Sequence, residues 1–272
     1  MLKGKKISFI GGGKMGSALI KGILAHNLIA PGKVTVADVV EGQLEELRKT
    51  YGVLATKDNK KAVGEADIII LAVKPQNMTE VLEGISGGID TGKLIITIAA
   101  GISTGFIEEH LKKGARVMRV MPNTPALIGE GAAAIARGSH ATDEDLALTL
   151  HIFDAVGITV TVKEDLMDAV TGLSGSGPAY AFVIIDALAD AGVNMGLARD
   201  IAVKLSAQTL LGAAKLCLIG DKHPAALKDM VTSPGGTTIA GLQAIEEGKL
   251  RATMMAAVEA ATLRAKELGR KK

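Results

Sequence analysis

The sequence has few of the side chains on which nucleic-acid-binding proteins depend. Aromatic residues make up only 2% of its 272 residues, so few rings are available for stacking on bases. The 31 Lys and Arg residues nearly balance the 29 Asp and Glu residues, and the two signs are interleaved along the chain. A net charge of +2 without a basic patch does not indicate a nucleic-acid partner.

Cysteine is nearly absent, since Cys217 is the only one. One cysteine excludes an intrachain disulfide and fits a reducing compartment. The apolar stretch around it, LLGAAKLCLIG, predicts a buried structural thiol and not a nucleophile. The histidines have no metal-site spacing, so we predict no metal; they are His26, His110, His140, His151 and His223.

Long apolar runs are missing as well. No run reaches about 18 residues, the usual length of a membrane span. The best candidate, AYAFVIIDALADAGV, is interrupted by Asp186 and Asp190. The apolar run near the N-terminus is too short for a signal peptide and ends in glycines. We therefore expect a soluble, cytoplasmic protein with no membrane partner.

The first half of the chain alternates between two patterns. Short apolar runs predict strands at Ile7–Ile10, Lys33–Ala37, Asp67–Val73, Lys93–Ile98, Arg116–Val120, Ala132–Ala136 and Gly157–Val162. Helical spacing appears at Met15–His26, Glu41–Thr50 and Thr142–Val156. Such alternation predicts βαβ units and a parallel-rich sheet that helices cover on both faces.

The pattern changes near Lys163, after which the sequence shows no convincing strand. Helices are predicted at Ala198–Ile219 and Leu250–Leu268 among others, rich in small apolar residues. We therefore predict an α/β Rossmann-type domain at residues 1–162 and an all-α domain at 163–272. The helical half is expected to bury apolar surface against another subunit; the alternative is that its helices pack only on one another.

A glycine motif follows the first predicted strand directly and precedes a predicted helix. It has the GxGxxG pattern of dinucleotide-binding domains, Gly11-Gly12-Gly13-Lys14-Met15-Gly16. In this motif the first glycine allows a tight turn, the second admits the pyrophosphate to the backbone, and the third allows close helix packing. The helix start offers N–H groups and a positive dipole end to the phosphates.

Asp38 ends the second predicted strand, about 20 residues past the glycine motif, where an acidic residue hydrogen-bonds the adenosine ribose. A carboxylate there repels a 2′-phosphate, and no Lys or Arg follows in the next three residues. The sequence therefore favours NADH over NADPH. The alternative is that Asp38 caps the helix near Glu41; capping and ribose binding can also hold together.

Two further strand ends are candidates for cofactor contacts, because parallel sheets bind ligands at the carboxyl ends of their strands. Ala72-Val73-Lys74-Pro75 ends one strand, and Ala99-Ala100-Gly101 ends another with small residues on which a flat ring can lie. Lys74 by itself is equally explained as a surface charge.

Two glycine-rich segments in the second half do not look like simple helix connectors. Residues 172–180, GLSGSGPAY, are predicted to join two helices. Residues 231–239, VTSPGGTTI, place hydroxyls and backbone N–H groups before a helix at about Thr237–Glu247. The second segment suits a small anion such as a carboxylate, and the alternative is a capped turn.

These segments resemble the signatures of pyrroline-5-carboxylate reductases. The similar motifs are LKDMVTSPGGTTIAGL at 227–242, DAVTGLSGSGPAY at 168–180, AVKP at 72–75 and PNTP at 122–125, in the order of the family. The likeness extends from about Lys6 to Leu268. It implies a Rossmann domain, a helical dimerisation domain, and homodimers or rings of dimers that reduce pyrroline-5-carboxylate to proline with NADH or NADPH.

The resemblance also implies site residues. The candidate cofactor contacts are Gly11, Gly12, Gly13, Lys14, Met15, Gly16, Asp38, Asn59, Ala72, Val73, Lys74, Pro75, Ala99, Ala100, Gly101 and Asn123. The candidate substrate contacts are Glu164, Ser176, Ser233, Gly235, Gly236, Thr237 and Thr238. Asp38 stands where many relatives carry a small polar residue or asparagine, and Met230 stands where some relatives carry asparagine.

Reduction of a cyclic imine depends mostly on positioning the hydride over the imine carbon. Thr238 is our candidate catalytic residue, through a hydrogen bond from its hydroxyl to the ring nitrogen. One alternative function is that of a 3-hydroxyacid dehydrogenase, which generally uses a catalytic lysine in its helical half. Lys204, Lys215 and Lys228 are available, but none lies in a glycine-rich substrate loop. Another alternative is a non-catalytic dinucleotide-binding sensor, which the intact segment 233–238 disfavours.

Overall fold

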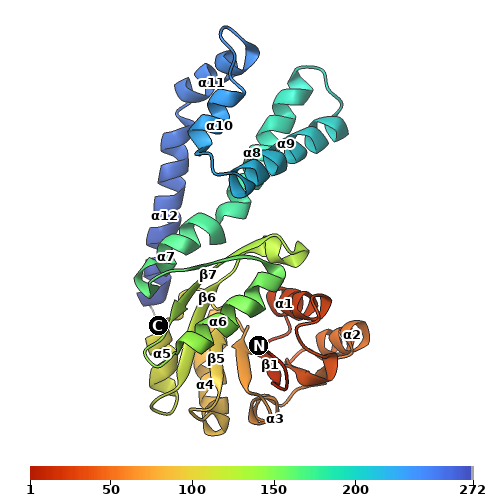
Figure 1. Ribbon diagram of the computed structural model, residues 1–272, viewed down its shortest axis with the longest axis vertical. Coiled ribbons are helices and arrows are strands. Elements are labelled where there is room, and N and C mark those ends of the chain that lie inside the picture. The colour runs from red at the N-terminus through yellow and green to blue at the C-terminus, as the bar shows by residue number, and fades with distance from the viewer. Residues whose placement is uncertain (271–272) are drawn as a thin grey trace. The chain divides into compact units, whose positions relative to one another are not determined.

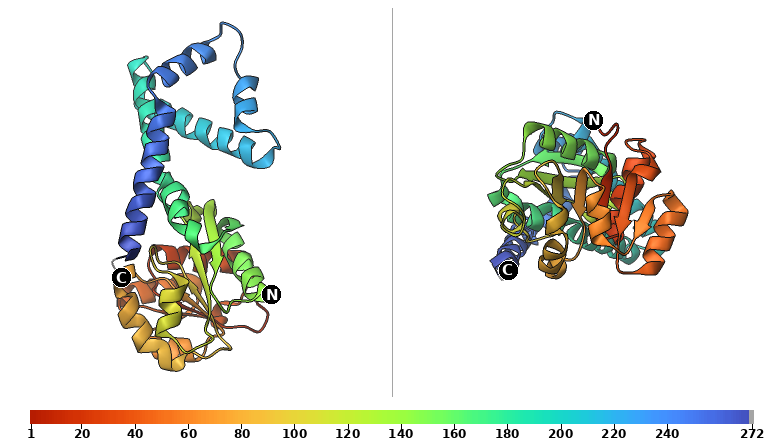
Figure 2. Two further views of the ribbon diagram at one scale, coloured as in Figure 1. Left: turned by 90° about the vertical axis from the view of Figure 1, so that its left-hand side faces the viewer. Right: turned by 90° about the horizontal axis from the view of Figure 1, so that it is seen from below.

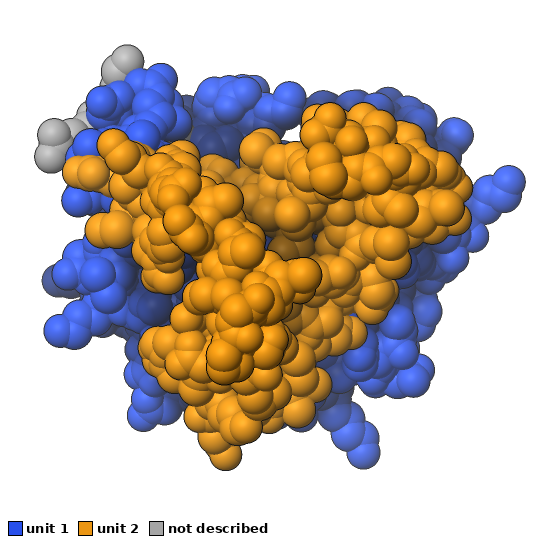
Figure 3. All heavy atoms as spheres, turned by 90° about the horizontal axis from the view of Figure 1, so that it is seen from above, with its two compact units in different colours: residues 1–176, 260–272 blue, residues 177–259 orange. Residues whose placement is uncertain are grey.

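The computed structural model describes residues 1–270 and divides into two compact units (Figures 1 and 3). One unit comprises Met1–Ser176 with the chain from Ala260 onward, and the other comprises Gly177–Glu259. The first contains the sheet and the dinucleotide motif, so it determines the geometry of the cofactor site.

The sheet has eight strands in the order β3-β2-β1-β4-β5-β6-β7-β8. They are β1 Ile7–Ile10, β2 Val34–Ala37, β3 Leu54–Thr56, β4 Ile68–Leu71, β5 Leu94–Thr97, β6 Arg116–Met121, β7 Gly131–Arg137 and β8 Gly157–Thr161. All neighbours are parallel except β6 and β7, which are antiparallel. The chain order reverses between β1 and β4, which is the switch point where open parallel sheets bind ligands.

Helices cover both faces of this sheet (Figure 2). They are α1 Lys14–Ala25, α2 Glu41–Tyr51, α3 Asn59–Gly64, α4 Met78–Ile85, α5 Thr104–His110 and α6 Asp143–Phe153. Successive strand residues point to opposite faces, so Ile68 and Ile70 pack with α1, α2 and α6, whereas Ile69 and Leu71 pack with α3, α4 and α5. Burial of each such side chain stabilises the fold by about 1.5–3 kcal/mol.

Local signals in the sequence determine where some of these helices start. Thr142 is the N-cap of α6: its hydroxyl accepts from the Asp145 N–H, and the Asp145 carboxylate accepts from the Thr142 N–H in return. Asp58 caps α3 by accepting from the Lys61 N–H at 3.1 Å. Such caps satisfy N–H groups that have no partner within the helix.

The predicted fold class is confirmed, and so is each strand predicted from an apolar run, with differences of at most two residues at its ends. The prediction missed β3 and the helices α3, α4 and α5. Short elements of this kind carry a weak periodic signal, and β3 has only three residues, of which Leu54 is exposed.

Residues 163–270 contain no strand, as expected. Their helices are α7 Met167–Val170, α8 Gly177–Asn194, α9 Arg199–Ile219, α10 Pro224–Met230, α11 Thr237–Glu247 and α12 Leu250–Arg270. The expected boundary at 162/163 marks the last strand, whereas the compact units divide after Ser176. Residues 271 and 272 of the predicted helical domain lie outside the described residues.

The prediction that residues 172–180 form a loop between two helices was wrong. Thr171–Gly175 forms a π-helical turn, and Glu164–Asn194 is one continuous helical stretch. The Asn123 side-chain amide donates to the Ser174 carbonyl at 3.0 Å, which satisfies a backbone group that the wider turn leaves available. Glycines here therefore accommodate a bulge and do not break the helix.

The unit of residues 177–259 leaves much of its apolar surface exposed. The prediction that Cys217 is buried was wrong: it is exposed, because within residues 1–270 the helix α9 has only one buried residue, Ala202. Two helical stretches, Glu164–Asn194 and Arg199–Ile219, are long and apolar enough to cross a membrane. In their most apolar 18-residue segments only 11% and 6% of the residues are buried. Two such helices are weak evidence for a membrane protein.

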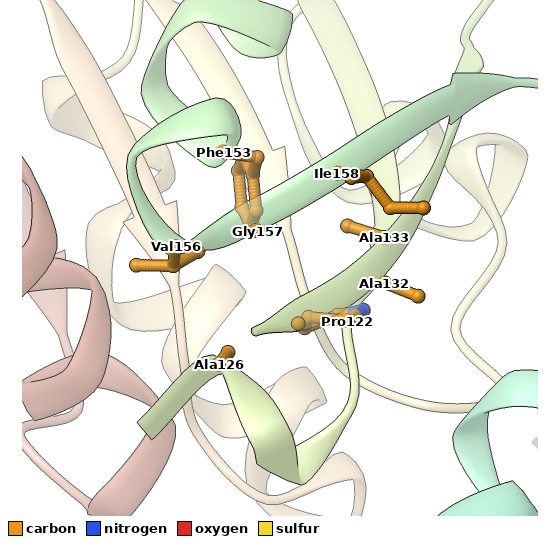
Figure 4. A pocket seen from close by; sticks show the side chains of 9 residues that line it. Pro122, Ala126, Ala132, Ala133, Phe153, Val156, Gly157 and Ile158 are labelled. Carbon is orange, nitrogen blue, oxygen red and sulfur yellow. The ribbon is translucent and has the colours of Figure 1, made fainter. Parts of the chain in front are cut away.

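A small pocket among η4 Thr124–Ile128, β7 and β8 belongs to the core (Figure 4). Its labelled side chains, among them Phe153, Val156 and Ile158, carry no polar atom that could orient a ligand. This pocket is therefore a packing feature and not a candidate ligand site.

Candidate functional site

The glycine motif has the geometry that dinucleotide binding requires. Gly11 has φ of +104°, and a Cβ there would lie 2.6 Å from the carbonyl oxygen of Ala72, the residue after the neighbouring strand β4. A Cβ at Gly16 would lie 2.5 Å from the Gly11 carbonyl oxygen, so a side chain would push α1 away from the turn. A Cβ at Gly13 would meet nothing within 4 Å, which leaves open space for a pyrophosphate at the start of α1.

The Asp38 carboxylate links the glycine loop to the loop after β2. One oxygen accepts from the Gly12 N–H at 2.7 Å, and the other accepts from the Val40 N–H at 2.9 Å. Asp38 does not cap α2, whose N-cap is Val40. A carboxylate has about four acceptor positions, so two remain for ribose hydroxyls.

A cleft of about 940 Å³ runs along the carboxyl ends of β1, β2 and β4. Its lining includes these predicted cofactor residues: Gly11, Gly13, Asp38, Asn59, Ala72, Val73 and Lys74. The structure therefore brings together residues that are up to 63 positions apart (74 minus 11). Gly12, Lys14, Met15, Gly16 and Ala99 do not line it; Gly12 and Gly16 act on the shape of the loop.

The cleft also has lining residues that the sequence prediction missed, notably Lys57 and Lys60. They follow β3, which pairs with β2 so that Ala37 lies beside Thr56. The prediction examined only the residues after Asp38 for a positive charge. The signal was present in the lysines near Asn59, but only the pairing of β2 with β3 places them beside Asp38.

A second pocket, of about 360 Å³, lies at the next strand end. Its lining is Pro75, Gln76, Ala100, Gly101, Thr171, Ala265 and Leu268. Three of these were predicted as cofactor contacts, whereas Gln76, Thr171 and the two residues of α12 were not. The small, mostly apolar lining suits a flat ring such as nicotinamide.

Glu164, a predicted substrate contact, is engaged within the sheet-containing unit. Its carboxylate accepts from the Thr104 N–H at 2.7 Å and the Thr104 hydroxyl at 2.5 Å, and it pairs with Arg119 at 3.3 Å. Arg119 is only 8% exposed and also lies 4.0 Å from Asp168. These contacts hold the start of the helical stretch against β6 and α5.

Asn123, a predicted cofactor contact, has both ends of its amide engaged by backbone groups. It donates to the Ser174 carbonyl and accepts from the Ala132 N–H at 2.9 Å. Ser176, a predicted substrate contact, donates its N–H to the Thr171 carbonyl at 2.9 Å. Neither residue is part of the lining of the two pockets described above.

The predicted substrate segment lies in the other unit, just before α11. Gly235 has φ of +68°, and the Gly236 N–H donates to the Ser233 carbonyl at 3.1 Å, which closes a tight turn. Gly236 is the N-cap of α11 and no side chain caps it, so Thr238 is not a cap. Within residues 1–270 the hydroxyls of Ser233, Thr237 and Thr238 have no hydrogen-bond partner.

The described residues contain no group of three or more His, Cys, Asp or Glu that could hold a metal ion.

Each half of the chain matches a protein-family model. Residues 164–268 match the family model described as pyrroline-5-carboxylate reductase dimerisation. Residues 6–101 match the model described as NADP oxidoreductase, coenzyme F420-dependent. The second match covers the glycine motif and the strand ends that line the cleft, and the first is associated with oligomerisation.

Relatives and solved structures cover nearly the whole chain. A pyrroline-5-carboxylate reductase of Methanosarcina acetivorans is 50% identical over 99% of this chain and 100% of its own length. A pyrroline-5-carboxylate reductase structure from Coxiella burnetii has a TM-score of 0.93 at 36% identity, covering 97% of this chain and 98% of that one.

The structure of Plasmodium falciparum pyrroline carboxylate reductase with NADP bound has a TM-score of 0.87 at 35% identity, covering 98% of each chain. The two structures share the fold of this chain throughout, and the archaeal relative shares half of its residues. These findings confirm the resemblance seen in the sequence motifs: the chain belongs to the pyrroline-5-carboxylate reductase family.

Proposed function

We propose that this protein reduces 1-pyrroline-5-carboxylate to L-proline with NADH or NADPH, the last step of proline biosynthesis. The proposal is supported by full-length similarity to named reductases and by a cleft that fits a dinucleotide. The observation that carries it is the turn before α11, where three hydroxyls have no hydrogen-bond partner within residues 1–270.

The turn offers two kinds of donor to the two polar groups of the substrate. The first N–H groups of α11 have no partner within the helix and carry the positive end of its dipole, so they suit the substrate carboxylate. The Ser233 hydroxyl adds a further donor. Thr238, one position into α11, presents a hydroxyl to the ring nitrogen of the bound imine.

A reduced nicotinamide supplies the hydride, which adds to the imine carbon while the nitrogen takes up a proton. Thr238 donates a hydrogen bond to that nitrogen and orients the ring, because a threonine hydroxyl is too weak an acid to supply the proton by itself. In this proposal water, and not Thr238, is the source of the proton. The small residues Ala100 and Gly101 in the lining of the 360 Å³ pocket would leave room for the nicotinamide ring.

Asp38 places a carboxylate at the ribose end of the cleft, so we propose that NADH is preferred. The exposed apolar helices and the dimerisation family match support a homodimer through residues 164–268, with rings of dimers built from it. We propose the cytoplasm as the site of action, in line with the single cysteine.

The test is oxidation of NADH by pyrroline-5-carboxylate, followed at 340 nm. Thr238→Ala should lower kcat by about a hundredfold or more, because a donor that acts mainly in the transition state is lost. Thr238→Ser restores the hydroxyl and should recover most of the activity. Thr253→Ala, an exposed threonine on α12, is the matched control and should behave as wild type.

Two outcomes would contradict the proposal. No turnover of pyrroline-5-carboxylate by the wild-type protein, with NADH still bound, would leave a dinucleotide sensor. A Thr238→Ala variant with wild-type kcat and a lowered melting temperature would assign Thr238 to helix stability and not to the reaction.

A further inference from the structure

The pairing of β2 with β3 brings a lysine to the ribose end of the cleft. Ala37 lies beside Thr56 in the parallel register, and the Asp38 N–H donates to the Thr56 carbonyl at 3.3 Å. Lys57, the residue directly after β3, therefore lies next to Asp38, and it lines the same cleft. A flexible ammonium at this place is a suitable counter-charge for a ribose 2′-phosphate.

Lys57 already has a partner, however. Its Nζ lies 2.8 Å from the Oε2 of Glu41, the first residue of α2, which does not itself line the cleft. The hydrogen bond from Lys57 lowers the pKa of the Glu41 carboxyl, with a smaller contribution from Arg48, so Glu41 is ionised at neutral pH. Both side chains are exposed, so Lys57 could reach a phosphate in the cleft only by giving up this contact with Glu41.

The other charges at this end do not replace Lys57. Asp58 is occupied as the N-cap of α3 and adds a further negative charge. Lys60 lines the cleft and has no ion-pair partner within residues 1–270, but it belongs to α3 and not to the stretch directly after β3 that lies beside Asp38. The balance of charge therefore depends on whether Lys57 is available.

We propose that Glu41 determines the choice of cofactor: it holds the Lys57 ammonium away from the 2′-phosphate position and so disfavours NADPH relative to NADH. Glu41 is a positioning residue, since it acts through Lys57 and not by contact with the ribose. The inference rests on the proposed use of a nicotinamide dinucleotide in this cleft. It adds a second determinant, from another element, to the repulsion expected from Asp38.

The first experiment measures kcat/KM for NADPH and NADH with the Glu41→Gln variant. Loss of the carboxylate frees Lys57, so the ratio of kcat/KM for NADPH to that for NADH should rise by about fivefold or more, as expected for a unit charge some 4 Å from a phosphate in water. Glu45→Gln on the same helix, exposed and outside the cleft lining, should leave the ratio unchanged.

The second experiment combines Glu41→Gln with Lys57→Met. If Glu41 acts through Lys57, the double variant should lose most of the gain in NADPH use. A double variant that keeps the whole gain would show that Glu41 acts by its own charge, and an unchanged ratio in Glu41→Gln would show that it has no part in discrimination. Either result overturns the inference, and melting curves verify that each variant is folded.

A binding measurement separates this inference from the proposed reaction. Calorimetry with adenosine 2′,5′-bisphosphate and with ADP reports the 2′-phosphate preference without turnover. The Glu41→Gln variant should bind the bisphosphate more tightly relative to ADP than the wild type does. That result without reduction of pyrroline-5-carboxylate rejects the proposed reaction alone, whereas a wild-type protein that binds neither nucleotide rejects both.

Discussion

The two compact units bury their apolar residues to very different degrees. In the sheet-containing unit, two clusters of side chains fill the spaces between sheet and helices, and Leu19 and Ile95 are completely buried. In the unit of residues 177–259, α8 and α9 each have one buried residue, Ala189 and Ala202. Phe182, on α8, is 65% exposed.

This difference separates folding from assembly. The sheet-containing unit completes its own core within one chain. The helical unit has the same kind of apolar side chains but too few neighbours to cover them, and large exposed apolar patches mark interaction sites. The match of residues 164–268 to a dimerisation family indicates oligomerisation, and the covering surface that we propose is the same face of a second copy.

The largest expected effect comes from a charge on the exposed helical face. Phe182→Asp should reduce the mass measured by light scattering to that of one chain, 28.0 kDa, because a carboxylate buried between subunits is costly. Leu54→Asp, at a half-exposed position on the edge strand β3, is the matched control and should leave the assembly intact. A Phe182→Asp protein of unchanged mass would contradict the assignment of this face to assembly.

A smaller effect is expected from truncation of equivalent leucines in the two units. Leu19→Ala should lower the free energy of unfolding by about 2–5 kcal/mol, because it leaves a cavity in a filled core. Leu211 on α9 is 44% exposed. Leu211→Ala should therefore stay within about 0.5 kcal/mol of wild type in urea unfolding at concentrations low enough to dissociate the assembly. Equal costs would remove the contrast between the units.

The smallest effect concerns cofactor choice inside the sheet-containing unit. Wild type should have a higher kcat/KM with NADH than with NADPH, and Asp38→Ser should narrow that gap by removing the charge that repels a 2′-phosphate. The variant also loses the acceptor for the Gly12 N–H, so KM for both cofactors is expected to rise. A wild-type preference for NADPH on the order of tenfold would contradict the role given to Asp38.

Much of the fold was predictable because its signals are local. Apolar runs of four to seven residues indicated strands, and the acidic turn after Thr142 indicated the start of α6. The glycine-rich stretch at 172–180 misled the prediction, since glycine permits a loop and a π-helical turn equally. The hydrogen bond that Asn123 donates to Ser174 in this turn comes from a residue 51 positions away and has no local signal.

The candidate site divides in the same way. The glycine motif and Asp38 were found in the sequence because their spacing along one βαβ unit is itself the signal. Lys57 was missed because its place beside Asp38 depends on the register of β2 and β3. Glu164 was named from the resemblance, and its contacts with Thr104 and Arg119 came only with the tertiary structure.

The sequence by itself determined the fold class, the dinucleotide motif and the family of this protein, because periodicity and motif spacing are properties of the chain. Only the tertiary structure decided which charges meet at the ribose end of the cleft and which apolar helices lack a cover within one chain. Those outcomes depend on strand register and on side-chain neighbours distant in sequence, and local patterns of hydrophobicity and glycine do not encode them.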